Sequence, residues 1–358
     1  MRVAVLGAGR MGRRRAELLA HNPVVQEIVI GNRTRERAEE LAASVGGRAD
    51  SFEGALGAHP DAVVVAASTA AHDELLGAAL ELRVPVFCEK PLTAALETSL
   101  AIASEATRLG VPVQVGYHRR FDPGFAEARR TVESGRLGTL YSATSVSYDH
   151  TLPGSEFLAG SGGIWKDLHV HDFDLLRWIT GLEVVSVFAV QGVRADERFE
   201  AYGDADTTAA VGVFEGGAVL SVRGARHDPR GQDVRVELLG SADSVVAGLD
   251  SRTPLRALGA TEEPWSTDSA YGDFLERFEA AFAAETAAFV ELATGRRSNP
   301  CPPSEDIAAL RIALACVRSV ETSTMQVVER THGDVRTAQH GQAEHGQAEH
   351  GQEEEHAR

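Results

Sequence analysis

The sequence has few cysteines and no long apolar run, and each shortage excludes a class of protein. Three cysteines in 358 residues, Cys88, Cys301 and Cys316, are an odd number without metal-ligand spacing. We therefore expect neither a disulfide framework nor a bound metal. No segment approaches the roughly 18 apolar residues that span a membrane, and the first residues, MRVAVLGAG, do not resemble a signal peptide. We expect a cytoplasmic globular protein.

Basic residues are outnumbered, because 35 Lys and Arg stand against 52 Asp and Glu, which gives a net charge of −17. Binding to phosphate backbones needs a basic face, so this balance argues against a nucleic-acid partner, and we expect no membrane partner either. The length is sufficient for two domains, each with its own core.

The N-terminal segment has the pattern of a dinucleotide-binding unit. A β-branched strand at residues 3–6 is followed by GAGRMG at residues 7–12 and by a helical run at residues 13–20. Glycines there allow the tight turn, the approach of the backbone to a pyrophosphate and close helix packing, and the helix N-terminus supplies amide donors. The predicted cofactor contacts in this turn are Gly7, Gly9, Arg10, Met11 and Gly12.

The end of the next strand bears on the choice of cofactor. This strand, at residues 27–30, leads into Gly31-Asn32-Arg33, where an NAD-specific domain usually has an acid for the ribose 2′-hydroxyl. Asn32 does not repel a 2′-phosphate, and the guanidinium of Arg33 can bind one. The sequence therefore favours NADP(H), with NAD(H) as the alternative if Arg33 faces only solvent.

Helices and strands continue to alternate, at residues 36–44, 62–67, 72–82 and 85–88, which is typical of a doubly wound parallel α/β sheet. Ligands bind at the carboxyl ends of such strands. We therefore predict further cofactor contacts at Ser68, Thr69, His72, Glu89 and Lys90. The ammonium of Lys90 can also stabilise an alkoxide that develops on a substrate, although a solvent-facing lysine is the alternative.

The segment GGIWKDLHVHDFDLLRW, residues 162–178, places three ionisable side chains on one face of a predicted helix. Asp167, His171 and Asp174 stand at i, i+4 and i+7. A carboxylate beside an imidazole suits proton transfer, since it can orient the ring and stabilise its charged form. In the alternative, Asp167 favours the helix dipole and His171 is only packed.

Four ordered motifs, at residues 3–12, 88–92 (CEKPL), 113–121 (VQVGYHRRF) and 161–174, resemble the glucose–fructose oxidoreductase, inositol dehydrogenase and MocA family, and inositol 2-dehydrogenases in particular. The resemblance spans about residues 1–328. It implies a Rossmann domain followed by an α+β domain with a large open, mainly antiparallel sheet. That sheet commonly forms the oligomer interface, so we expect a homo-oligomer, either a dimer or a tetramer.

The resemblance also implies a catalytic lysine, aspartate and histidine, which here are Lys90, Asp167 and His171. Arg119 matches a position that approaches the substrate, although a salt bridge between the domains is the alternative. The loop that begins at Asp149 and His150 stands where the family shapes its substrate pocket, although such side chains more often contact only water. The predicted substrate contacts are Lys90, Arg119, Asp149, His150, Asp167 and His171.

One departure from the pattern concerns the substrate. Residues 230–233 read R-G-Q-D where inositol dehydrogenases resemble Y-G-Y-D. Another cyclitol, an inosose or a sugar of similar size is therefore as good a candidate as myo-inositol. We predict an NAD(P)-dependent oxidoreductase that transfers hydride between the nicotinamide and a secondary alcohol or ketone of such a ring. A non-catalytic NAD(P) sensor, or an enzyme that recycles bound NAD for epimerisation or glycoside cleavage, are the alternatives.

In the expected reaction His171 exchanges the hydroxyl proton, Asp167 orients His171, and Lys90 stabilises charge on the oxygen. The expected domains are residues 1–120 for the dinucleotide, residues 121–328 for substrate and oligomerisation, and a disordered tail at residues 329–358. The tail repeats His, Gly, Gln and Glu without apolar residues to bury. Its histidines, five residues apart, offer at most a loose metal site. Strands are predicted at 139–148, 184–193, 207–214, 218–225 and 234–239, and helices at 125–133, 271–294 and 304–322.

Overall fold

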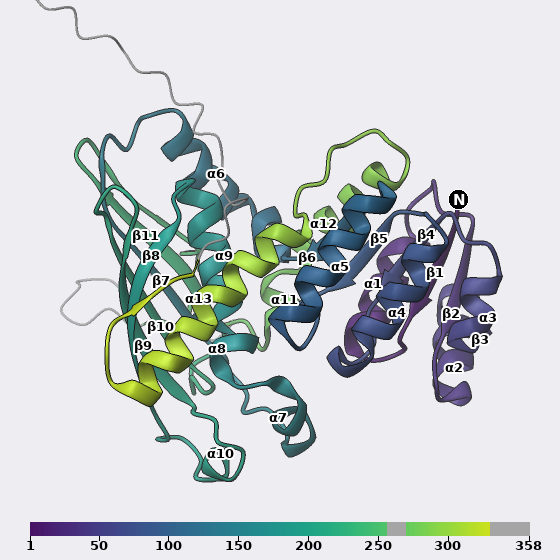
Figure 1. Cartoon of the computed structure of the whole chain (residues 1–358), viewed down its shortest axis with the longest axis horizontal. Helices are drawn as coiled ribbons and strands as arrows, with labels where there is room; N and C mark the ends of the chain where they lie inside the picture. Colours follow the sequence, from purple (N-terminus) through teal and green to yellow (C-terminus); the bar gives the residue numbers. More distant parts are fainter. Residues whose placement is uncertain (256–269, 330–358) are drawn as a thin grey trace, which may run out of the picture.

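The computed structural model describes residues 1–255 and 270–329, which form two lobes that are each built on one sheet (Figure 1). The first sheet has six parallel strands in the order β3-β2-β1-β4-β5-β6, which confirms the predicted Rossmann topology. Its elements are β1 (Arg2–Leu6), α1 (Arg10–Ala20), β2 (Glu27–Gly31), α2 (Arg35–Val45), β3 (Arg48–Asp50), α3 (Phe52–Gly57), β4 (Ala62–Val65), η1 (Thr69–Ala71), α4 (His72–Glu81), β5 (Val86–Glu89), α5 (Leu96–Leu109), β6 (Val113–Gly116) and η2 (His118–Phe121).

The central strands of this sheet are short apolar runs because helices cover both of their faces. Every residue of β4 and β5 is buried. The carboxyl ends of β1, β4 and β5 meet at one edge, where β1 leads into Gly7 and β5 ends one residue before Lys90. This edge faces the second lobe and supplies the residues of the candidate site.

The second sheet has seven strands in the order β12-β11-β7-β10-β9-β8-β13. Its pairs are antiparallel except for β7 and β10, which are parallel, and this confirms the predicted, mainly antiparallel sheet. The elements of this half of the chain are α6 (Pro123–Glu133), β7 (Leu140–Tyr148), α7 (Ser155–Ser161), α8 (Ile164–Asp167), α9 (His169–Thr180), β8 (Val184–Gly192), α10 (Arg198–Ala201), β9 (Thr207–Phe214), β10 (Val219–Ala225), β11 (Asp233–Gly240), β12 (Ser244–Ala247), α11 (Phe274–Arg277), α12 (Glu279–Ala293), α13 (Pro303–Thr322) and β13 (Gln326–Val327).

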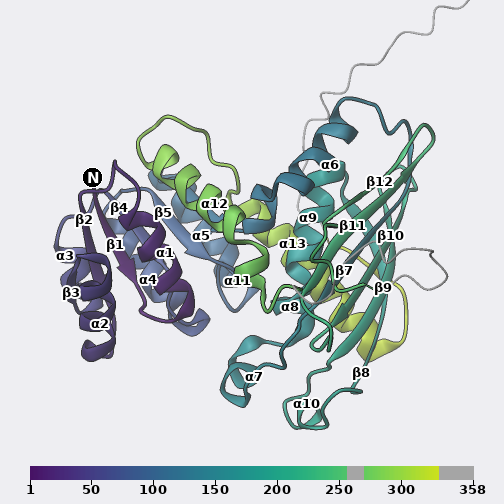
Figure 2. The same cartoon turned by 180° about the vertical axis from the view of Figure 1, so that it is seen from behind.

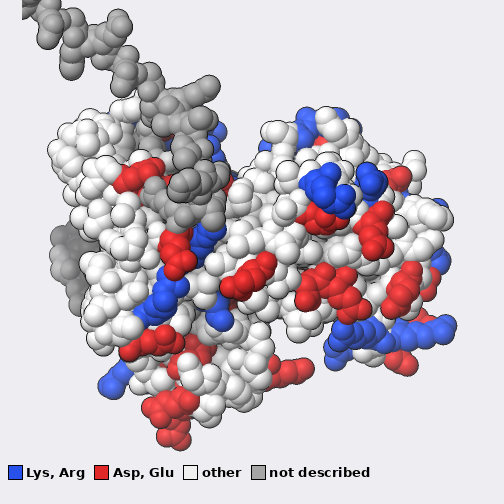
Figure 3. All heavy atoms as spheres, viewed as in Figure 1, with Lys and Arg blue, Asp and Glu red and all other residues white. Residues whose placement is uncertain are grey.

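The two faces of the second sheet differ in what covers them. Helices α6, α9 and α13 lie on the face that is turned toward the first lobe (Figure 2). On the opposite face no described helix packs, and alternate side chains such as Val190, Val211 and Val219 are about half exposed. Charges of both signs are interspersed over the surface seen in Figure 3. The left edge of that view, where the second sheet lies, is largely uncharged.

The chain returns to the first lobe after the second sheet is complete. Helix α12 packs against α1, and Phe289, Val290 and Leu292 belong to the same buried cluster as Val3 and Val5. The expected boundary between residues 120 and 121 remains a prediction, and the return of α12 shows that the chain contributes to the first lobe again beyond it.

Two predicted helices are divided in the structure. The helix expected at residues 271–294 is interrupted at Phe278, whose φ of −111° is not helical and whose ring packs 4.8 Å from that of His118. The segment at residues 162–178 forms α8 and α9, which meet at Leu168. The break at Phe278 therefore coincides with an aromatic contact to η2, a distant part of the chain, which is invisible in the local sequence.

The predicted tail lies, apart from Glu329, outside the described residues. Within residues 1–255 and 270–329, the helices lack the combination of length and hydropathy that a membrane span requires.

Two glycines of the first turn give a matched test of this geometry. A Cβ on Gly12 would lie 1.9 Å from the carbonyl oxygen of Gly7, whereas a Cβ on Gly9 would meet nothing within 4 Å. Gly12→Ala should therefore lower the free energy of unfolding by roughly 1–3 kcal/mol, the usual cost of overpacking. Gly9→Ala should fold with native stability but lose dinucleotide affinity, since its methyl group enters the ligand space. Urea denaturation and nucleotide binding measure both effects, and equal stability of the two variants would contradict the predicted packing role of Gly12.

Candidate active site

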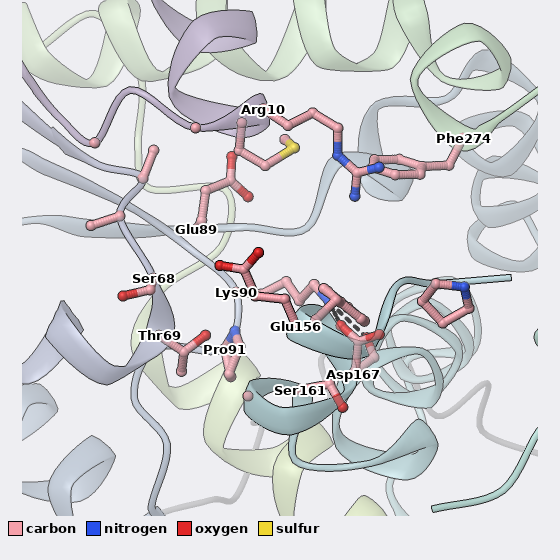
Figure 4. Close-up of a pocket in the computed structure, with 18 of the residues that line it drawn as sticks. Arg10, Ser68, Thr69, Glu89, Lys90, Pro91, Glu156, Ser161, Asp167 and Phe274 are labelled. Atoms are coloured by element: carbon pink, nitrogen blue, oxygen red, sulfur yellow. Dashed lines mark hydrogen bonds and ion pairs between the residues drawn. The ribbon is translucent and has the colours of Figure 1, made fainter. Parts of the chain in front are cut away.

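A cavity of about 920 Å³ lies between the carboxyl edge of the first sheet and the second lobe. It runs from the glycine turn after β1, past the loop that follows β5, to residues of α8, α9 and the end of β10. Figure 4 shows residues from both lobes around it, with Lys90 directed toward Asp167 and Arg10 facing Phe274. The cavity therefore joins the predicted cofactor turn to the predicted catalytic residues.

The glycine turn is shaped for a phosphate-bearing ligand. Gly7 has a φ of +117°, which a side chain would oppose, and the space beside Gly9 is open. Among the described residues no side chain caps the N-terminus of α1, so its amide donors remain available for a pyrophosphate. These residues fit a dinucleotide that extends along the cavity.

Most of the predicted cofactor contacts line this cavity. Gly12 does not, because it packs against Gly7, and this packing is its contribution to the turn. His72 lines the cavity, and its Nδ1 and Nε2 lie 2.9 and 3.3 Å from the carbonyl oxygens of Pro91 and Ala67. It therefore fixes the loops after β4 and β5. The predicted contacts that line the cavity are Gly7, Gly9, Arg10, Met11, Asn32, Arg33, Ser68, Thr69, His72, Glu89 and Lys90.

The ribose end of the cavity carries free positive charge. The side-chain oxygen of Asn32 accepts from the backbone N–H of Ala8 at 3.1 Å, and its amide donates to the carbonyl of Thr34 at 2.9 Å. Arg33 and Arg37 are exposed, line the cavity and have no ion-pair partner in the described part of the chain. Asn32 thus braces the turn, while two guanidinium groups remain available.

Lys90 and Asp167 form the central ion pair of the substrate end. Nζ of Lys90 donates to the backbone oxygen of Asp167 at 2.7 Å and to its Oδ1 at 2.8 Å (Figure 4). Nη1 of Arg226 donates to Oδ2 of Asp167 at 2.7 Å. Burial alone would raise the pKa of Asp167, but the two cations more than offset this and hold its pKa well below the usual range. The carboxylate is therefore ionised, and each of its oxygens accepts a hydrogen bond from a cation.

The expectation that Asp167 orients His171 is wrong in this structure. Both carboxylate oxygens bind cations, which form stronger charge-assisted hydrogen bonds than a neutral imidazole. Nδ1 of His171 is buried without a hydrogen-bond partner in the described residues. The ring is held instead by edge-on contacts with Tyr117 and His118, at centroid distances of 5.5 and 5.1 Å.

The surroundings of His171 keep its imidazole neutral. Burial lowers the pKa of His171 well below 6.5, and the positive charges of Lys90 and Arg119 lower it further, as does His118. A neutral imidazole at neutral pH can accept a proton. The arrangement thus places a proton acceptor, His171, and a fixed ammonium, Lys90, on one cavity.

The other predicted substrate contacts are divided. Arg119 lines the cavity, and its Nη1 donates to Ser147 at 2.9 Å and to Asp172 at 2.8 Å. Asp149 also lines the cavity. His150 lies outside the cavity lining, and its Nδ1 is 2.9 Å from the carbonyl oxygen of Asp228. The structure therefore brings together all of these predicted residues except His150.

Sequence reasoning missed several residues of the cavity. Arg226 directly follows β10 and no motif marks it, while Gln232, directly before β11, was noted only as part of the departure at residues 230–233 and not as a cavity residue. His118 stands beside Arg119 in the HRRF motif, so the prediction of Arg119 as a site residue was a signal that His118 also lies near the site. An aromatic wall from the end of the chain has no local signal, because its spacing resembles an ordinary helix core; it consists of Phe274, Phe278 and Phe282.

Comparisons with known proteins agree with this geometry. A family profile described as "Oxidoreductase family, NAD-binding Rossmann fold" matches residues 1–117, and one described as "GFO/IDH/MocA C-terminal domain" matches residues 125–246. A myo-inositol dehydrogenase of Streptomyces leeuwenhoekii is 36% identical over 332 residues, which cover 91% of this chain and 99% of the relative.

Two further relatives support the same assignment. A scyllo-inositol 2-dehydrogenase (NAD(+)) of Bacillus subtilis is 32% identical over 326 residues, covering 89% of this chain and 94% of the relative. The crystal structure of a putative myo-inositol dehydrogenase from Sinorhizobium meliloti superposes with a TM-score of 0.84 at 28% identity, over 92% of this chain and 100% of that chain.

The comparisons support NAD binding and give no support to the NADP(H) preference that Asn32 and Arg33 predict. Profiles matched to both lobes and relatives above 30% identity over nine-tenths of the chain identify the protein's family. The chain belongs to the GFO/IDH/MocA family of oxidoreductases, and its first lobe is an NAD-binding Rossmann domain.

Proposed function

We propose that the protein is a dehydrogenase that interconverts a secondary alcohol and a ketone on a cyclitol ring, or on a sugar of similar size. One observation carries the proposal: Lys90 and His171 line a single cavity that continues into the glycine turn. Relatives named as inositol dehydrogenases support the substrate class. They also favour turnover over the alternatives of a sensor and of an enzyme that recycles bound NAD.

The residues of the cavity divide the work of the reaction. A bound nicotinamide supplies the hydride acceptor or donor. His171 takes the hydroxyl proton during oxidation and returns it during reduction. Lys90 has three N–H donors and two are used on Asp167, so one remains for the substrate oxygen as charge develops there.

The charges at the substrate end point to an uncharged polyol. The cations Lys90 and Arg226 face the carboxylates of Asp167 and Asp149, with the Arg226–Asp149 distance at 3.6 Å. Arg119 is paired with Asp172 at 2.8 Å. A phosphorylated or carboxylated substrate would find no unpaired cation among these residues, whereas hydroxyl groups can bind to both signs of charge.

A panel of inositol isomers, inososes and hexoses, assayed by nicotinamide absorbance with both cofactors, tests the function. We expect turnover of at least one cyclitol or sugar, and His171→Ala should lower that turnover about a hundredfold or more while dinucleotide affinity is retained. His150→Ala is the matched control, since His150 lies outside the cavity lining. Normal turnover of His171→Ala would remove this residue as the proton acceptor, and a wild type inert toward the whole panel would refute the substrate class.

We infer that the ribose end accepts the 2′-phosphate of NADP(H) in addition to NAD(H). The support is the chain's own pair of exposed guanidinium groups, Arg33 and Arg37, beside Asn32 in place of an acid. Arg33→Ala should weaken NADP(H) binding roughly tenfold, the equivalent of one charge-assisted hydrogen bond, and leave NAD(H) unchanged. Calorimetry with both nucleotides measures this. Binding of NAD(H) alone by the wild type would overturn the inference.

We also infer that the outer face of the second sheet pairs with a second subunit. Val190, Val211, Val219 and Leu239 are between 46% and 52% exposed on it, and an exposed apolar patch of this kind marks an interface. Sedimentation should show a dimer or tetramer, and Val211→Glu should shift it toward the monomer. Leu100→Glu, at an exposed apolar position on α5, is the control. A monomeric wild type at micromolar concentration would contradict the interface.

A further inference from the structure

Arg226 follows β10 directly and lines the substrate end of the cavity. It is 2% exposed, and its backbone N–H donates to the carbonyl oxygen of Asp206 at 2.8 Å, which fixes the start of the side chain. Its role is not given by the sequence motifs. Burying a guanidinium costs free energy unless neighbouring groups pair with its charge and accept its hydrogen bonds.

The hydrogen bonds of Arg226 are concentrated on one carboxylate. Nη1 donates to Oδ2 of Asp167 at 2.7 Å, while Oδ1 of the same carboxylate accepts from Lys90 at 2.8 Å. Asp149 lies farther away, at 3.6 Å from Nη1. The carboxylate of Asp167 is therefore shared between two cations that come from different elements of the fold.

The remaining nitrogens of Arg226 do not act as a structural brace. Nε and Nη2 are buried without a hydrogen-bond partner in the described residues, although a guanidinium that ties elements together normally uses most of its five donors. Its Cζ lies 5.9 Å from the ring centre of Phe157 on α7, so an aromatic face covers part of the group. The charge of the side chain therefore lies at the cavity wall, and few of its N–H groups form hydrogen bonds that stabilise the fold.

Sharing Asp167 changes the charge that Lys90 presents. In an isolated pair, the carboxylate would cancel the ammonium. With Arg226 on the second oxygen and Asp149 3.6 Å from Arg226, the two cations and two carboxylates carry no net charge, whereas without Arg226 the same group would carry one net negative charge next to His171. The charge of Arg226 therefore favours a developing alkoxide and disfavours protonation of the imidazole.

We propose that Arg226 is a positioning residue of the reaction: it holds the second oxygen of Asp167, so that Asp167 cancels less of the positive charge that Lys90 presents to the substrate oxygen. The proposal rests on the proposed function for its effect on turnover. Its effect on His171 does not depend on finding a substrate.

The groups around His171 define what a titration reports. Those facing the imidazole are Lys90 from the loop after β5, Tyr117 from the end of β6, and His118 and Arg119 from η2. Arg226 acts on it through Asp167. When Arg226 is replaced by a neutral residue, Asp167 cancels more of the positive charge of Lys90. His171 then loses part of the positive field that lowers its pKa.

The test compares Arg226→Gln with Arg226→Lys in the full-length protein, with Arg108→Gln as a control on an exposed arginine of α5. Histidine proton NMR of the ligand-free protein follows the titration of His171. We expect the His171 midpoint to move to higher pH in Arg226→Gln and to stay near the wild-type value in Arg226→Lys. Dinucleotide affinity should remain unchanged in both variants.

Kinetics give the second readout once a substrate is found. Arg226→Gln should lower kcat/KM about tenfold or more, with the acid limb of its pH profile shifted upward, and Arg226→Lys should restore the position of that limb. An unchanged His171 midpoint in Arg226→Gln, accompanied by a lower melting temperature, would show that Arg226 is only structural and overturn the proposal. If Arg226→Gln does not fold, a His171 midpoint in Arg226→Lys that rises well above the wild-type value overturns it instead. An inert wild type with the expected NMR shift would count against the proposed function and not against Arg226.

Discussion

The contact between Lys90 and Asp167 joins the two halves of the site. Lys90 follows the last residue of a Rossmann strand, Asp167 ends a short helix of the other lobe, and two hydrogen bonds link them across 77 positions of the chain. The helix is itself fixed at its start, where Asp204 accepts the N–H of Ile164 at 2.8 Å after Gly163 with a φ of +91°. The position of the ammonium therefore depends on the folding of both lobes.

Because both oxygens of Asp167 bind cations, the pKa of His171 is set by other groups. A carboxylate partner would raise the pKa of an imidazole and favour its charged form. Here burial, Lys90 and Arg119 lower the pKa of His171, and aromatic contacts hold its ring. A neutral imidazole can accept a proton, so in the proposed reaction the positive charges that would stabilise an alkoxide also keep His171 unprotonated.

Local patterns predicted the parts of the molecule that local interactions determine. The glycine turn, the alternating strands and helices, and the placing of Lys90 at a strand end follow from short-range sequence. The spacing of Asp167 and His171 marked them as well, and the family motifs added the expected catalytic roles. The contact between Arg226 and Asp167 could not be predicted, because Arg226 stands 59 positions later in the chain, directly after β10. The helix break at Phe278 likewise coincides with a contact to His118 in another part of the chain.

The departure at residues 230–233 acts through this same network. Gln232 stands at the second tyrosine position of the pattern Y-G-Y-D, is 3% exposed, and donates from its amide to Oδ1 of Asp149 at 3.0 Å. The other oxygen of Asp149 lies 3.6 Å from Arg226. A tyrosine has a single hydroxyl at this position, whereas the amide of Gln232 holds the carboxylate of Asp149 in place. Asp149 lines the cavity, so under the proposed function its carboxylate offers this wall a hydrogen-bond acceptor for a substrate hydroxyl.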